Sequence, residues 1–186
     1  MADGGDPCHI SCGERLLGTA FMKITTLCVL AALTLAGAPA FGQAVMLNFS
    51  FPEMRQQLTD LKSSVTSEAE TSDKIRYLEA KAESGLIYAV YGFECDSKEP
   101  SQRCRGAEMI ASFTLEDKND VDEALDLIDY AAVADYKGSD GNLKLSRYVI
   151  FDNGITPANL KVNLEVFLSI SGKVWDMLED EGYFDK

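Results

Sequence analysis

The sequence predicts an α+β fold: an antiparallel sheet of about five or six strands packed by two to three helices. Three observations predict this class. Two runs rich in aromatic and aliphatic residues, 86–93 and 106–115, flank a polar loop and are typical of a strand hairpin. A second hairpin is expected over 133–151. Segments with helical spacing of apolar residues lie before, between and after these strands, so the expected order is α-β(2-4)-α-β-β-α.

The first helix is expected to begin at Pro52, because proline is tolerated in a first turn and Met54, Leu58 and Leu61 recur at helical spacing. The following stretch, 65–85, alternates less regularly and is broken at Ser72-Asp73 and again at 83–85. These breaks indicate one or two strands before the first hairpin.

The second helix is expected to begin near Asp120. Asp120 and Glu123 have the spacing of a capping box, in which each residue's side chain bonds the other's backbone N–H. An apolar stripe at helical spacing would then follow, made by Val121, Leu125, Ile128 and Ala132. In the second hairpin, Ser139-Asp140-Gly141 supplies the turn.

The last helix is expected to begin after a turn at 152–154, with Thr156 as N-cap and Pro157 in the first helical position. One apolar stripe comprises Leu160, Leu164, Phe167, Leu168, Trp175 and Leu178, and a second, adjacent stripe comprises Val162, Val166, Ile170 and Val174. Together they span a wider arc than a helix on a single sheet usually needs. The helix is therefore either deeply buried or uses the second stripe to bind a partner.

Residues 22–42 are expected to be a secretory signal peptide. Lys23 follows Met22, an apolar run continues to about Ala36, and Ala40 and Gly42 stand at the positions that signal peptidase prefers. The alternative is a membrane anchor, although the run is short for a bilayer. Residues 1–21 are then a spurious or disordered extension, with either Met1 or Met22 as the true start. Residues 43–186 are expected to form a single domain.

Two cysteines remain after such cleavage, Cys95 and Cys104, and the only histidine, His9, is lost. An exported chain meets an oxidising compartment, so this pair is expected to form a disulfide across the hairpin. Redox-active pairs usually have two intervening residues, whereas eight lie here. Two thiolates without histidine also make a poor zinc site. The expected location is the periplasm, or the outside, of a bacterium.

The acidic composition argues against several partner classes. The net charge is −13, which opposes nucleic acid and anionic membranes. No second hydrophobic segment follows the signal, so no stable membrane insertion is expected after cleavage. Basic proteins and cations remain compatible with this charge.

No enzyme and no cofactor is predicted. A histidine-free domain excludes Ser-His-Asp and Cys-His catalysis, and the sequence has no phosphate-binding or nucleophile-elbow motif. A hydrolase using paired carboxylates is the weaker alternative. A divalent-cation site is another alternative, formed by the acidic segment 116–123. That segment lacks the spacing of a calcium loop, and an acidic first helical turn also accounts for it.

The segment 145–178 resembles the YbjN-domain family, described as bacterial sensory-transduction regulators whose fold is similar to that of type III secretion chaperones. The residues that carry the resemblance are Asp152, Gly154, Thr156, Asn159, Leu160, Asn163, Leu164 and Phe167. It covers roughly residues 50–180 and is closest to an exported branch of the family. It implies a non-catalytic, protein-binding, chaperone-like or regulatory role, with either an unknown protein or a second copy as the partner.

Overall fold

The computed structural model describes residues 44–96, 102–117 and 119–184. These residues belong to one compact unit, Phe41–Lys186. The expected extension 1–21 and signal peptide 22–42 lie outside the described residues, as does the centre of the loop that joins the two cysteines. No helix among the described residues is long and apolar enough to cross a membrane.

The predicted α+β class is confirmed. A seven-stranded sheet has the order β2-β3-β4-β5-β7-β6, with the short β1 pairing with the beginning of β5, and every pair is antiparallel. The elements are β1 (Phe49–Ser50), α1 (Phe51–Asp60), β2 (Ser64–Glu70), β3 (Arg76–Lys81), β4 (Ile87–Cys95), β5 (Arg103–Phe113), α2 (Val121–Asp126), β6 (Ala134–Lys137), β7 (Leu143–Ile150) and α3 (Pro157–Asp180).

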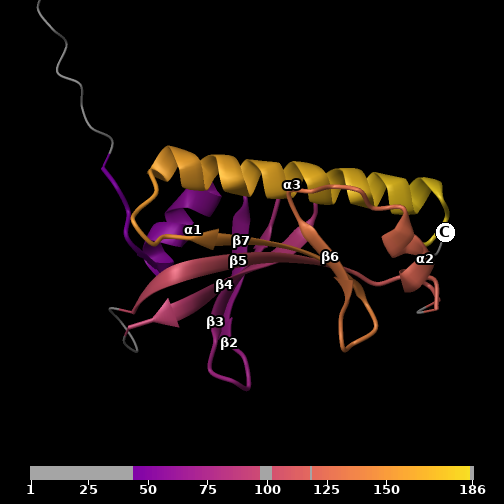
Figure 1. Ribbon diagram of the computed structural model, residues 1–186, viewed down its shortest axis with the longest axis horizontal. Coiled ribbons are helices and arrows are strands. Elements are labelled where there is room, and N and C mark those ends of the chain that lie inside the picture. The colour runs from indigo at the N-terminus through magenta and orange to yellow at the C-terminus, as the bar shows by residue number, and fades with distance from the viewer. Residues whose placement is uncertain (1–43, 97–101, 118, 185–186) are drawn as a thin grey trace, which may run out of the picture. The chain divides into compact units, whose positions relative to one another are not determined.

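The helices among the described residues cover only one face of the sheet. Figure 1 shows α3 running along one side of the sheet, with α1 beneath its N-terminal end and α2 near its C-terminal end. The core lies between these helices and the sheet, because alternate strand residues point to opposite faces. We call the helix-side surface of the sheet the covered face. Its buried side chains include Leu78, Ala80, Tyr88, Val90, Met109, Ala111, Phe113, Leu143 and Leu145.

Helix α1 begins with a full capping box that also ties it to β5. The Ser50 hydroxyl accepts from the Glu53 backbone N–H, and the Glu53 carboxylate accepts from the Ser50 N–H at 2.8 Å. Arg103, at the start of β5, donates to the same carboxylate at 3.0 Å. Burial raises the pKa of Glu53, but these bonds and the charge of Arg103 together outweigh it, so the pKa is lowered. The predicted helix is confirmed and begins one residue before Pro52.

Helix α2 is shorter than predicted, and its capping box is absent. Asp120 has helical backbone angles (φ −75°, ψ −11°) and its side chain makes no capping hydrogen bond. A capping side chain needs an extended N-cap residue to reach forward to the third helical N–H, so the predicted box was wrong. The helix ends at Asp126, and Ala132, expected on its apolar stripe, lies exposed beyond it.

The predicted disulfide is confirmed. Cys95 and Cys104 are register partners at the ends of β4 and β5, and their sulfur atoms are bonded at 2.07 Å. Gly92 makes room for it, because a Cβ at this position would lie 2.7 Å from the Cys104 sulfur and 2.9 Å from the ring of Phe51. A disulfide indicates an oxidising compartment.

Candidate functional site

The α3 stripe predicted to bind a partner is not one surface. Val162 is 54% exposed, but Ile170 is 8% and Val174 0% exposed, and Val166 is half-buried. Residues four apart are rotated by about 40° per step around a helix, so a line of four such residues turns from solvent into the core. We therefore correct the prediction: Ile170 and Val174 pack against the sheet and are not available to a partner.

The residues that carry the family resemblance have structural positions. The Thr156 hydroxyl caps α3 by accepting from the Asn159 N–H at 3.1 Å, and Asn163 Oδ1 accepts from Arg147 of β7 at 2.6 and 3.0 Å. Gly154 has a positive φ of 87°, and Asp152 is exposed in the same turn. Leu160, Leu164 and Phe167 are buried in the core. The geometry therefore gives Thr156 a capping role and Leu160, Leu164 and Phe167 packing roles, and no contact among the described residues shows a role for Asp152.

Two carboxylates of the acidic segment 116–123 make local bonds. Asp117 Oδ1 accepts from both the backbone and the side chain of Asn119 at 2.8 Å, and Asp122 pairs with Lys137 at 2.9 Å. Within the described ranges, no three His, Cys, Asp or Glu side chains come together as a metal site. The cation site at 116–123 stays a prediction, and no contact in this segment favours it. The hydrolase with paired carboxylates also stays a prediction.

The strongest candidate is the opposite surface of the sheet, which we call the open face. The strand register aligns one row of side chains across four strands: Tyr77 opposite Tyr91, Tyr91 opposite Glu108, and Glu108 opposite Tyr148. Cross-strand neighbours on one face lie close enough to interact directly. The open face is completed by Glu79, Lys81, Ile87, Ala89, Phe93, Gly106, Ile110, Ser112, Ala134, Tyr136, Lys144, Ser146 and Ile150.

An aromatic pair lies at each end of this row. The rings of Tyr77 and Tyr91 are 5.0 Å apart, and those of Phe93 and Tyr148 are 5.7 Å apart. Tyr148 reaches Phe93 by lying over Gly106, where a Cβ would come within 2.1 Å of the tyrosine hydroxyl. Glycine on β5 therefore lets a ring from β7 bridge to β4.

The face remains accessible although many of its side chains are apolar. Tyr148 is 48% exposed, Ile150 and Ile87 are each 57% exposed, and Tyr91 and Phe93 are half-buried. Partial burial raises the pKa values of Tyr91, Tyr136 and Tyr148, and the Glu108 carboxylate raises them further. These tyrosines are therefore neutral hydrogen-bonding groups at ordinary pH.

Glu108 lies at the centre of the row without a partner of its own. Within the described part of the chain no hydrogen bond or ion pair reaches its carboxylate, although Lys144 and Lys81 lie on the same face. Lys144 is instead paired with Asp140 at 3.1 Å. A half-buried carboxylate between aromatic rings offers a cation both an ion pair and ring faces. The arrangement is therefore suited to binding a basic side chain.

This face was not predicted from the sequence, although the sequence of β4 carries a signal for it. A strand with one solvated face alternates apolar and polar residues, whereas both alternate sets of β4 are apolar from Ile87 to Phe93. That pattern indicates a second apolar face but does not locate Glu108, whose position depends on the register. The chain matches no family model, no curated protein and no solved structure.

Proposed function

We propose that this protein is a non-catalytic component of a bacterial envelope that binds a basic protein partner on the open face of its sheet. The resemblance to the YbjN-domain family supports a chaperone-like or regulatory role of this kind. The disulfide supports a periplasmic or secreted location, together with the signal peptide expected over 22–42.

The row Tyr77, Tyr91, Glu108 and Tyr148 is the observation that carries the proposal. Tyrosine and arginine dominate the binding energy of many protein interfaces, because they combine a large contact area with directed hydrogen bonds. An arginine or lysine of the partner would pair with Glu108 and lie over the neighbouring rings. The exposed Ile87 and Ile150 would contribute apolar contact at the ends of the face.

The charge of the chain favours a different protein over a second copy. The net charge is −13, so two copies repel each other. The tyrosine hydroxyls also suit a surface that is in water when the partner is absent, whereas permanent dimer interfaces are more apolar.

Site-specific crosslinking followed by reconstitution tests the proposal. A photoreactive residue at Tyr148 in the native host is expected to capture a partner that the same residue at Lys161, on the exposed side of α3, does not. The captured protein is then purified and titrated calorimetrically with the wild-type chain and with Glu108→Gln. We expect Glu108→Gln to weaken binding by on the order of tenfold or more.

Glu165→Gln is the matched control, because it removes one carboxylate from α3, away from the open face. It is expected to leave the affinity unchanged. Equal binding by the wild type and Glu108→Gln would refute the proposal, and so would capture at Lys161 and Tyr148 alike. A rise in mass with protein concentration, with no other protein captured, would identify a second copy as the partner and refute it as stated.

A further inference from the structure

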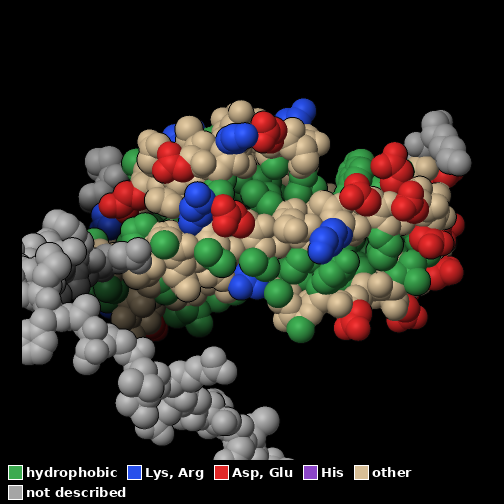
Figure 2. All heavy atoms as spheres, turned by 90° about the horizontal axis from the view of Figure 1, so that it is seen from above, with side chains coloured by type: hydrophobic (Ala, Val, Ile, Leu, Met, Phe, Trp, Pro, Cys, Tyr) green, Lys and Arg blue, Asp and Glu red, His purple; other side chains and the backbone are tan. Residues whose placement is uncertain are grey.

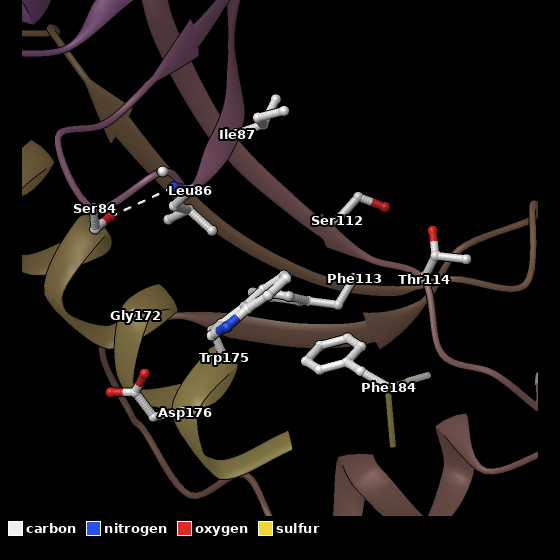
Figure 3. A pocket seen from close by; sticks show the side chains of 11 residues that line it. Ser84, Leu86, Ile87, Ser112, Phe113, Thr114, Gly172, Trp175, Asp176 and Phe184 are labelled. Atoms are coloured by element: carbon white, nitrogen blue, oxygen red, sulfur yellow. Dashed lines mark hydrogen bonds between the residues drawn. The ribbon is translucent and has the colours of Figure 1, made fainter. Parts of the chain in front are cut away.

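A cavity of about 620 Å³ lies near the C-terminal end of α3. None of the row residues Tyr77, Tyr91, Glu108 and Tyr148 lines it. Its walls come from three places: the β3–β4 turn with Ser84 to Ile87, the end of β5 with Ser112 to Thr114, and α3 with the residues after it. Figure 3 shows Trp175 projecting from α3 into the space between the turn and Phe184. Pockets that hold small ligands usually measure about 300–1,000 Å³.

The lining is aromatic and aliphatic with one charge. Trp175 stacks on Phe184 with ring centroids 4.5 Å apart and lies 6.3 Å from Phe113, yet it remains 43% exposed. Leu86 and Ile87 add aliphatic surface. Asp176 is the single charged residue among the lining residues, and within the described chain it makes no ion pair. Figure 3 shows the Asp176 carboxylate pointing away from the Trp175 ring, so this exposed charge lies at the rim of the cavity. A large half-exposed indole in a cavity with a carboxylate at its rim is suited to an apolar group that carries positive charge.

Gly172 is an independent sign that this space is kept open. It lies within the 24-residue helix α3, where glycine costs about 1 kcal/mol relative to alanine. Packing does not require it, because a Cβ at this position would meet nothing within 4 Å. Any side chain here would project into the cavity, so the glycine preserves the volume of the cavity at the expense of helix stability.

The surroundings favour a cation over an anion. Figure 2 shows acidic side chains gathered at the end of the molecule where α2 and the C-terminal end of α3 lie. Tyr183, next to Phe184, has a raised pKa, because of burial first and then the negative charges of Glu123, Asp120 and Glu181. A negative field of this kind concentrates cations at the entrance and repels anions.

We propose that this cavity is a binding site for a small organic cation, an aromatic or alkyl body joined to an ammonium group. The body would pack on Trp175, Phe113 and Phe184, and the ammonium would lie toward Asp176. The site goes beyond the proposed partner binding: the cavity shares Ile87 and Ser112 with the open face, but neither Glu108 nor the tyrosine row lines it.

Trp175 is the only tryptophan in the chain, so its fluorescence reports directly on the cavity. The probes are benzyltrimethylammonium, the uncharged benzyl alcohol and the anion benzoate. We expect a saturable change in emission with benzyltrimethylammonium, an affinity on the order of fivefold lower for benzyl alcohol, and the weakest binding for benzoate. A linear response without saturation, or equal affinities for the three probes, would overturn the proposal.

Two variants locate the site while retaining Trp175. Gly172→Leu fills the cavity and is expected to abolish the response while keeping or raising the melting temperature, because leucine favours helix more than glycine does. Asp176→Asn is expected to remove the preference for the cation, whereas the matched Glu165→Gln is expected to retain it. If Gly172→Leu responds like the wild type, the probe binds elsewhere and the proposal fails. Glu108→Gln is expected to bind the cation normally, which separates this test from that of the partner-binding face.

Discussion

The two faces of the sheet are both apolar but are built from different residues. The covered face carries Leu145, Met109 and Val90, which have no polar atoms in contact with water, and it is sealed by α1 and α3. The open face carries tyrosines, in which each apolar ring ends in a hydroxyl, together with the Glu108 carboxylate. One strand supplies both faces, since β4 alternates Tyr88 inward and Tyr91 outward.

This difference indicates what each face does. Aliphatic side chains at close-packed density stabilise a fold, because nearly all their surface is removed from water. Aromatic side chains with polar ends tolerate water and still offer a large contact area when a partner arrives. Even the hydroxyl of Tyr88 on the covered face is bonded, to Ser63 at 2.8 Å. At the centre of the open face, by contrast, Glu108 has no hydrogen-bond or ion-pair partner among the described residues.

The largest contrast is expected from truncating one aromatic residue on each side. Phe167 of α3 is fully buried, with its ring centroid 6.1 Å from that of Tyr88. Phe167→Ala is expected to lower the free energy of unfolding by about 3–5 kcal/mol. Tyr148→Ala on the open face is expected to lower it by less than about 1 kcal/mol. Urea unfolding of both variants under oxidising conditions checks this, and similar losses would show that the open face is part of the stabilising core.

A second effect should come from the disulfide, which lies on the covered side beside Phe51. Cutting the Cys95–Cys104 bond, which closes a loop with a sequence separation of 9, is expected to lower the free energy of unfolding by about 2–3 kcal/mol. Urea unfolding with and without reductant measures this loss. The double variant Cys95→Ala, Cys104→Ala should not respond to reductant, and an equal response in that variant would assign the loss to another cause.

A smaller effect of opposite sign, a gain in stability, is expected from replacing a buried polar side chain on the covered side. Ser171 of α3 is fully buried, and its hydroxyl has no hydrogen-bond partner among the described residues. Ser171→Ala removes an unsatisfied polar group and is expected to raise the free energy of unfolding by about 1 kcal/mol. Ser169→Ala, at an exposed position of the same helix, should gain only a few tenths of this from helix propensity. If the two variants gain equally, burial of the Ser171 hydroxyl carries no penalty.

The smallest effect is expected in the titration of the open face. Burial is the largest cause that raises the pKa values of Tyr91, Tyr136 and Tyr148 above the ordinary 10.0. The Glu108 charge also raises all three, after Tyr77 and Tyr136 at Tyr91 and after Glu94 at Tyr148. The folded chain therefore retains protons that the unfolded chain releases. This contribution to stability is present below pH 10 and is lost as pH rises through the raised pKa values.

Glu108→Gln should shift this titration toward lower pH, and the ultraviolet absorbance of the phenolate form measures the shift. The control Glu165→Gln removes a carboxylate from α3 and should leave the curve in place. An unchanged curve in Glu108→Gln would mean that the carboxylate does not affect the pKa values of the tyrosines. The two faces would then differ in their side chains but not in the effect of a charge.

Local chemistry was sufficient for much of the fold. Thr156 and Pro157 mark the start of α3 because a cap and a fixed φ act within one turn, and Cys95 and Cys104 had only each other to pair with once the leader was set aside. Both hairpins were predicted because their strands and turns are continuous in sequence. The failure at Asp120 is instructive, since the right spacing for a capping box was present but the backbone conformation that the box needs was not.

The sequence by itself determined the α+β class, the disulfide, the acidic charge and the boundaries of most elements, because these follow from neighbours along the chain. Only the tertiary structure decided that Ile170 and Val174 face the core, that Tyr77, Tyr91, Glu108 and Tyr148 form one row, and that Gly172 opens onto a cavity. The physical reason is distance along the chain. The register of four strands and the rotation of a long helix over a sheet are set by packing between residues far apart in sequence, and no local pattern records them.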